Sequence, residues 1–276
     1  MVGTLIGGRA AGMRVSMASV AARAGRVNED FTGAVPAGAV LIDGAGIPGA
    51  EATCRHGVAW YASRLGGALL ALLAPGPGRD LRDLLAEAIE RVTDAHRGTC
   101  DVANPIGPSA TVAMLRVSGE VLDHLVLGDS SLVLDRADGA PVVVTDPREV
   151  VISRAYVPAL EAAGQGTDEY QRILGELRAH RNAPGGFWLA RDDPRAAGEA
   201  VTGSCPIPEL SGAVLLSNGA ARIADGPEPI GWPEVLAVLA SSGPAEVIRR
   251  VRQAEARHAV RPDDATITHC TGLDEA

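Results

Sequence analysis

The chain has 276 residues, a hydrophobic content of 46% and a formal net charge of −9 at pH 7. This length and apolar content suffice for one large α/β domain, and we expect residues 1–276 to form a single domain. The negative charge argues against general nucleic-acid binding, because that function needs cationic surface to displace counterions from phosphates. All 25 basic residues are arginine, which we attribute to GC-rich coding rather than to phosphate recognition.

Membrane association and secretion are not indicated. The first 25 residues lack the sustained apolar centre of a signal peptide. The long apolar stretch 58–74 is interrupted by Arg64 and a Gly-Gly pair, and it is shorter than the ~20 residues needed to span a bilayer. We therefore expect a soluble, cytoplasmic protein that binds neither membrane nor nucleic acid.

The four cysteines are far apart in the sequence and form no Cys-x-x-Cys pair. This spacing predicts neither a zinc site nor a redox motif, and reduced thiols are the simplest interpretation. His56, His96, His124 and His269 show no His-x-x-His or Glu-x-x-His spacing, and His56 and His96 fall on predicted helices.

The first half of the chain alternates between strand and helix patterns. Alternating or β-rich segments predict strands at 14–21, 37–42, 111–117, 121–127, 132–135 and 142–145. Between the second and third of these, apolar residues spaced by three and four predict a helix hairpin over 50–74 and 81–95, broken by Pro75-Gly76-Pro77-Gly78. The polar turn 118–120 predicts a β-hairpin.

The second half begins with a predicted surface helix over 168–181, followed by an irregular and mobile segment over 182–204 that is rich in Gly, Pro and charge. The remaining predictions are a short buried strand at 213–216, a turn at 217–219, helices at 232–240 and 244–258, and a closing strand at 265–270. Strand runs followed by helix pairs predict an α+β fold of two mostly antiparallel sheets, packed face to face with helices outside.

Five short acidic or small-residue blocks lie at predicted strand ends or turns. They are 26–30 (Arg-Val-Asn-Glu-Asp), 43–46 (Asp-Gly-Ala-Gly), 128–130 (Gly-Asp-Ser), 217–219 (Ser-Asn-Gly) and 263–266 (Asp-Asp-Ala-Thr). Each block alone is an ordinary turn signal. Carboxylates at the ends of separate strands can nevertheless converge on hard divalent cations, which prefer oxygen ligands.

Each acidic residue also has a plain structural interpretation. Asp43 follows an apolar run and is either a turn residue or a ligand at the sheet rim. Glu29 and Asp30 point to opposite faces if the segment is extended, so that one of them faces a given metal directly; a solvated acidic turn is the alternative. Asp129 can be a simple hairpin residue.

Arg26 is the candidate for the substrate phosphate, because a guanidinium can contact two phosphoryl oxygens at once. Arg23 is the alternative phosphate ligand, and a surface ion pair is the alternative role for Arg26.

The order of the blocks resembles that of the PPM-type (type 2C) metal-dependent Ser/Thr protein phosphatases over roughly residues 25–270. In that family the blocks read Arg-x-x-Asn-Glu/Gln-Asp, Asp-Gly-x-Gly-Gly, Gly-Asp-Ser, Ser-Asp-Gly and Asp-Asp/Asn-x-Thr. The segment 109–112 is similar to a strand start of the family, and 184–188 (Pro-Gly-Gly-Phe-Trp) resembles a segment of actinobacterial members.

The resemblance implies a four-layer α-β-β-α sandwich with two Mn²⁺ or Mg²⁺ ions at one end. By the same resemblance, Asp43 bridges both ions, the Gly44 carbonyl adds a ligand and Asp263 completes the first metal. Glu29 belongs to the second metal and Asp30 supports it through water. Asp129 contributes to a weaker third-metal position.

Three positions depart from the family pattern. Asn218 stands where the family has a metal-binding Asp, the second block reads Asp-Gly-Ala-Gly-Ile, and Arg26 lies one residue nearer to the acidic pair. An amide oxygen can still be a ligand but carries no charge, so metal affinity is expected to fall.

The resemblance implies hydrolysis of phosphoserine and phosphothreonine in proteins, with reduced activity. The alternative is a catalytically weak or inactive module that binds a phosphoprotein or a Ser/Thr kinase through the same cleft. A hydrolase acting on small phosphoesters is a third hypothesis that the sequence does not separate from the first.

Overall fold

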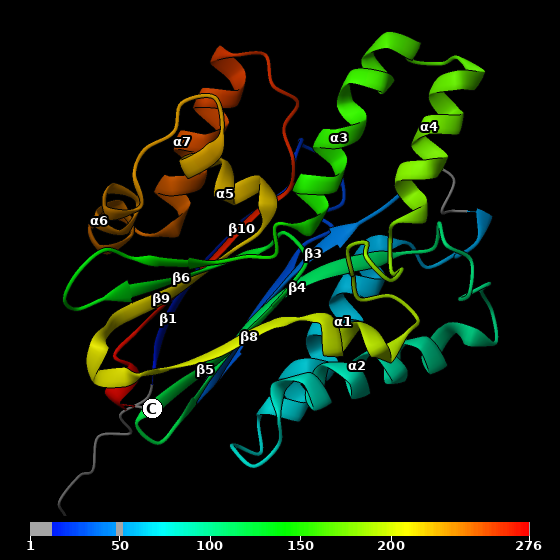
Figure 1. The fold of residues 1–276 in the computed structure, drawn as a ribbon. Helices are drawn as coiled ribbons and strands as arrows, with labels where there is room; N and C mark the ends of the chain where they lie inside the picture. Colours follow the sequence, from blue (N-terminus) through cyan, green and yellow to red (C-terminus); the bar gives the residue numbers. More distant parts are fainter. Residues whose placement is uncertain (1–12, 48–51, 276) are drawn as a thin grey trace, which may run out of the picture.

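A computed structural model describes residues 13–47 and 52–275, and these form four layers of helix, sheet, sheet and helix (Figure 1). Both sheets have five strands, and every pairing within them is antiparallel. The predicted α+β class and the α-β-β-α sandwich are therefore confirmed. No helix among the described residues is long and apolar enough to cross a bilayer.

The first sheet has the strand order β2-β3-β4-β5-β8. Its strands are β2 (Phe31–Val35), β3 (Gly38–Ala45), β4 (Ser109–Ser118), β5 (Val121–Leu127) and β8 (Val201–Pro206). The helices α1 (Val58–Leu73) and α2 (Leu81–Arg97) cover its outer face, as Figure 1 shows. Within β3, Val40 and Ile42 pack toward these helices, whereas Ala39 and Leu41 pack toward the second sheet. Burial on both faces explains why this strand is an uninterrupted apolar run.

The second sheet has the strand order β1-β10-β9-β6-β7. Its strands are β1 (Arg14–Val20), β10 (Ala265–Thr271), β9 (Leu210–Leu216), β6 (Ser131–Arg136) and β7 (Val142–Val144). Helices α5 (Asn218–Asp225), α6 (Trp232–Ser242) and α7 (Pro244–Arg257) cover its outer face. The inter-sheet core includes Leu41 and Leu115 from the first sheet and Leu132 and Leu215 from the second.

Helices α3 (Arg148–Ala163) and α4 (Asp168–Ala179) extend beyond one end of the sandwich (Figure 1). The sequence predicts α4 but not α3. Helix α3 has no buried residue and contains Pro158, and α4 buries only Ile173. An unburied helix carries no strong apolar stripe, so hydrophobic periodicity does not reveal it.

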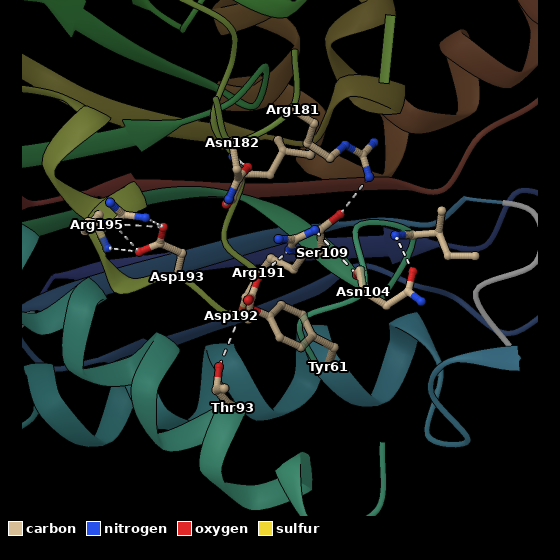
Figure 2. A network of polar contacts seen from close by, with 12 residues as sticks. Tyr61, Thr93, Asn104, Ser109, Arg181, Asn182, Arg191, Asp192, Asp193 and Arg195 are labelled. Atoms are coloured by element: carbon tan, nitrogen blue, oxygen red, sulfur yellow. Dashed lines mark hydrogen bonds and ion pairs between the residues drawn. The ribbon is translucent and has the colours of Figure 1, made fainter. Parts of the chain in front are cut away.

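The prediction that 182–204 is irregular and mobile is partly wrong. Its end forms a 3₁₀ helix (Pro194–Glu199) and the edge strand β8. Hydrogen bonds fix the remainder, as Figure 2 shows. The Tyr61 hydroxyl donates to the Arg191 carbonyl at 2.7 Å, and Asn182 exchanges two hydrogen bonds of 2.9 Å with the backbone of Leu189.

Several predicted boundaries also change. The first helix of the hairpin begins at Val58, whereas the sequence predicts a start at residue 50. Residues 50 and 51 of that prediction lie outside the described residues. His56 therefore precedes the helix, whereas His96 lies on α2 as predicted. The strand expected at 213–216 begins at Leu210, and β2 is an additional strand. The block 217–219 is the start of α5 rather than a free turn.

Candidate metal centre

A cavity of about 450 Å³ opens at one end of the sandwich and collects most of the predicted site residues. Six carboxylates and three guanidinium groups line it: Glu29, Asp43, Asp129, Glu149, Asp263 and Asp264, with Arg26, Arg222 and Arg261. Gly44 and Asn218 belong to the same lining. Asp30 does not line the cavity, whereas the adjacent Glu29 does, as expected if the two side chains point to opposite faces of an extended segment.

Asp43 and Gly44 are positioned by the pairing of β3 with β4. Asp43 lies opposite Thr111 and Gly44 opposite Ala110, so the strand continues past Asp43 instead of ending there. A Cβ atom on Gly44 would overlap the Glu29 carbonyl oxygen and a methyl group of Val58. Glycine is therefore required where the segment that carries Glu29 crosses β3.

Asn218 lies between two carboxylates of the cavity. Its backbone N–H, at the start of α5, donates to Asp43 Oδ2 at 2.8 Å. Its side-chain Nδ2 donates to Asp129 Oδ2 at 2.7 Å. The residue that departs from the family pattern is thus in contact with two of the predicted ligands, from which it is far removed in sequence.

The cavity disfavours negative charge in the absence of cations. Burial raises the pKa of Asp43 well above its ordinary value, and the nearby carboxylates of Asp30 and Asp129 raise it further. Burial also raises the pKa of Asp129, although the hydrogen bond from Asn218 acts to lower it. Carboxylates that are desolvated and close to one another gain most from a dication.

Glu29 and Asp30 are held by different contacts. The backbone N–H of Glu29 donates to Asp264 Oδ2 at 2.7 Å, and that of Ala22 donates to Asp264 Oδ1 at 2.6 Å. Burial raises the pKa of Glu29, whereas nearby Arg26 lowers it.

The side chain of Asp30 is buried, and neither of its oxygens has a hydrogen-bond partner of good geometry among the described residues. Burial raises its pKa to about 6, although the hydroxyls of Thr266 and Ser217 lie near enough to oppose that rise.

Asp263 and Arg26 lie at the open side of the cavity. The Asp263 side chain is 59% exposed and pairs with Arg222 at 3.2 Å. Arg26 is exposed and lines the cavity, whereas Arg23 is exposed but is not part of the lining. Of the two candidate arginines, only Arg26 therefore lies where the carboxylates converge.

Comparison with solved structures yields several similar folds. One is the catalytic domain of the serine/threonine protein phosphatase PstP in complex with two manganese ions, with a TM-score of 0.59, 20% identity, and coverage of 94% of this chain and 98% of that one. The chain has the PPM-type Ser/Thr phosphatase fold.

Two further solved structures support this assignment of the fold. The PPM Ser-Thr phosphatase MsPP from Mycobacterium smegmatis, in complex with cacodylate, gives a TM-score of 0.57 and 20% identity over 95% of this chain and 99% of that one. A serine/threonine phosphatase from Staphylococcus aureus gives 0.59 and 14% over 94% of each chain. No family model and no curated protein matches the sequence.

On this PPM-type fold, Glu149 is a cavity residue that the sequence analysis missed. It lies in the first turn of α3. Burial and the charge of Asp129 raise its pKa to about 7, although Arg181 lowers it. The Asp146-Pro147 pair before α3 is a helix-start signal that could have located it.

Asp146 positions the neighbouring turn on the same fold. Its N–H donates to the Gly128 carbonyl at 3.3 Å, next to Asp129, and its carboxylate forms a salt bridge with Arg148 at 2.7 Å. Asp146 is 2% exposed. It therefore supports the turn that carries Asp129 from behind.

The donor set of the cavity fits hard divalent cations. A bound cation would relieve the mutual repulsion and the desolvation of the Asp43 and Asp129 carboxylates. Among the described residues, no three carboxylate groups of the cavity place their oxygens within 4.8 Å of one another. The spacing thus leaves room for the water ligands that Mg²⁺ and its relatives usually retain.

Proposed function

We propose that this protein is a metal-dependent hydrolase that removes phosphate from phosphoserine and phosphothreonine in proteins, with activity reduced by Asn218. The observation that carries the proposal is the single cavity in which Glu29, Asp43, Asp129 and Asp263 lie with Arg26 at the opening. Its similarity to structures of Ser/Thr phosphatases supports the same reaction class.

Two Mn²⁺ or Mg²⁺ ions are the proposed cofactors, with a third, weaker position. Asp43, the Gly44 carbonyl, Asp263 and Glu29 would hold the two ions, with Asp263 on the first and Glu29 on the second, and Asp129 would contribute to the third position. Asn218 would offer an amide oxygen at the remaining ligand position. When bound, such ions supply Lewis-acid activation of water and positive charge for the phosphoryl group.

The chain's own residues would orient the reaction. Arg26 binds the phosphoryl oxygens at the mouth of the cavity through its guanidinium group. The Asn218 N–H holds one oxygen of the Asp43 carboxylate, and Asp264 accepts from the backbone N–H of Glu29 and so fixes the segment that carries it. Asp30, which does not line the cavity, would act on the ions through water.

The second candidate function is a phosphatase-like module that binds a phosphoprotein or a Ser/Thr kinase without turnover. The Asn218 amide supports this candidate, because its bond to Asp129 ties a proposed ligand to a neutral side chain. A cation would have to displace that bond, so metal occupancy is expected to be lower than with a carboxylate at this position.

The free thiols of all four cysteines suit a reducing compartment, and we propose a cytoplasmic location. The extent of the structural match, 94% of the chain, supports the proposal that residues 1–276 form one domain.

The test is hydrolysis of a phosphoserine or phosphothreonine peptide with added Mn²⁺, with and without chelator. We expect turnover that requires the metal and is lost in Asp43→Ala and Asp263→Ala, with Asp94→Ala, on the exposed side of α2, as the matched control. Activity that persists in chelator would refute the proposal. Metal binding without turnover would support the binding module, and turnover of p-nitrophenyl phosphate alone would support a small-phosphoester hydrolase.

A further inference from the structure

Two cysteines and a histidine form a second cluster, outside the carboxylate cavity. One ligand atom from each of Cys54, His56 and Cys100 lies within 4.8 Å of the other two. His56 Nδ1 is 3.8 Å from Cys54 Sγ and 3.3 Å from Cys100 Sγ. It is the only such group of His, Cys, Asp or Glu among the described residues.

The fold brings these residues together through the α1–α2 hairpin. Cys54 and His56 directly precede α1, and Cys100 directly follows α2, so the antiparallel helices place both segments at one end. The Asp101 N–H donates to the Thr53 carbonyl at 3.0 Å and links the two segments. The Trp60 ring stacks on His56, with centroids 4.3 Å apart, and fixes the imidazole.

Gly57 shapes the turn that carries His56 into α1. It is the N-cap residue of that helix and has φ +78°, a conformation that favours glycine. Cysteine binds metals as the thiolate, so uptake of a cation by this cluster releases protons.

We propose that Cys54, His56 and Cys100 bind a Zn²⁺ ion. Zinc bonds of ~2.3 Å to sulfur and ~2.0 Å to nitrogen in a tetrahedron separate the ligand atoms by about 3.5–3.8 Å. The distances from His56 Nδ1 to the two sulfurs already lie close to that range. Thiolate and imidazole ligands favour zinc, whereas the carboxylates of the main cavity favour harder ions. The two sites therefore differ in the class of metal they take.

Cys54 and Cys100 line a small cavity, and we place the fourth ligand of the ion there. The cavity has a volume of about 10 Å³ and is also lined by His96, among other residues. This volume accommodates one water molecule. The bound ion clamps the segment that follows β3 to the segment that precedes β4, and these two strands carry Asp43 and Thr111 of the carboxylate cavity. The zinc site does not depend on the proposed function.

The experiment uses full-length protein, reduced and stripped of metal, and titrated with Co²⁺ as a spectroscopic substitute for Zn²⁺. Thiolate-to-Co²⁺ charge-transfer absorption in the near ultraviolet reports cysteine ligands only, so Co²⁺ in the carboxylate cavity does not contribute. We expect one equivalent of this signal, its loss on addition of Zn²⁺, and its absence in Cys54→Ser and Cys100→Ser. Cys205→Ser and Asp43→Asn are the controls that should retain it.

Because Cys54 is buried and its substitution can impair folding, alkylation of the unmodified protein is a second measurement. Zn²⁺ should protect Cys54 and Cys100 from alkylation, as mapped by mass spectrometry, and should leave the modification of Cys205 and Cys270 unchanged. Absence of the charge-transfer signal in the reduced protein, or its persistence in Cys100→Ser, would overturn the proposal. A Cys54–Cys100 disulfide in a protein whose reduced form takes up no Zn²⁺ would also overturn it.

Discussion

Replacing Asn218 by Asp changes the charge of the cavity without changing the size of the side chain. In the wild-type chain the Asn218 amide donates to Asp129 Oδ2 at 2.7 Å, while its backbone N–H donates to Asp43. Asn218→Asp removes the side-chain donor and sets a third carboxylate between two others. Without metal it should destabilise the protein, and with metal it should add a charged ligand.

Two terms determine the magnitude. A hydrogen bond to a charged group contributes about 1.5–3 kcal/mol, and two unit charges 4 Å apart repel by about 4 kcal/mol at an effective dielectric constant of 20. Protonation of one carboxyl sets an upper limit to this cost. Keeping an ordinary aspartate protonated at pH 7 costs about 4 kcal/mol, so a larger repulsion would be removed by uptake of a proton. We expect the metal-free variant to lose about 3 kcal/mol of unfolding free energy.

Metal binding relieves the repulsion between carboxylates in the variant. In the wild-type protein, metal binding must instead break the Asn218–Asp129 hydrogen bond before Asp129 can act as a ligand. Both effects favour the variant. A difference of about 3 kcal/mol corresponds to roughly 100-fold tighter Mn²⁺ binding by the variant. The turnover rate of the variant should exceed that of the wild-type protein most at limiting Mn²⁺, and the difference between the two rates should narrow at saturating Mn²⁺. The assays are urea denaturation in chelator, calorimetric Mn²⁺ titration and phosphopeptide hydrolysis.

Asn104→Asp is the matched control, because Asn104 donates to Asp101 Oδ2 at 3.1 Å on the exposed surface, where water screens the added charge. That variant should leave Mn²⁺ affinity unchanged. If Asn218→Asp alters neither stability nor metal affinity, then Asn218 does not face the metals and the reasoning is refuted. Tighter binding without turnover would identify the binding module.

Three further predictions concern the metal-free protein. Asp30→Asn should raise the unfolding free energy at pH 7.5 by up to about 3 kcal/mol, because burial raises the pKa of Asp30 from 3.8 to about 6 and thereby disfavours its charged form. The charged Asp30 destabilises the folded protein above pH ~6 and no longer does so below pH ~4, so the stability gain of Asp30→Asn in urea denaturation should disappear at acid pH. An equal gain at acid and neutral pH would contradict the raised pKa of Asp30. Asp264→Asn should lower stability by about 2–4 kcal/mol, since Ala22 and Glu29 donate to different oxygens of Asp264 and the amide replaces one of these acceptors by a donor. Hydrogen exchange should accelerate at the N–H that loses its acceptor. Gly66→Ala should lower the unfolding free energy by about 1–3 kcal/mol, because its Cβ would overlap the Phe31 ring. Gly67→Ala, on the open side of the same helix, should raise the unfolding free energy by roughly 0.5–1 kcal/mol. Thermal melts that rank the two variants in the opposite order would show that α1 is packed differently.

Local sequence pattern predicted those elements whose apolar residues are dictated by a buried face. The apolar run at 39–42 is a strand because both of its faces are covered, and α2 has the regular apolar spacing of a helix that packs on a sheet. Helix α3 and strand β8 escaped prediction because neither has a well-buried face. The start of α5 was interpreted as a turn, since Ser-Asn-Gly is a common turn sequence.

The sequence by itself determined most strands and helices and the order of the acidic blocks, because these depend on residues that are neighbours along the chain. Only the tertiary structure decided which of these residues meet. Asn218 contacts Asp43 and Asp129 because the start of α5 and the ends of strands from both sheets converge at one edge of the sandwich. Cys54, His56 and Cys100 meet because two helices of the right length run antiparallel between them. Contacts of this kind depend on strand register and helix packing over long sequence separations, and no local spacing encodes them.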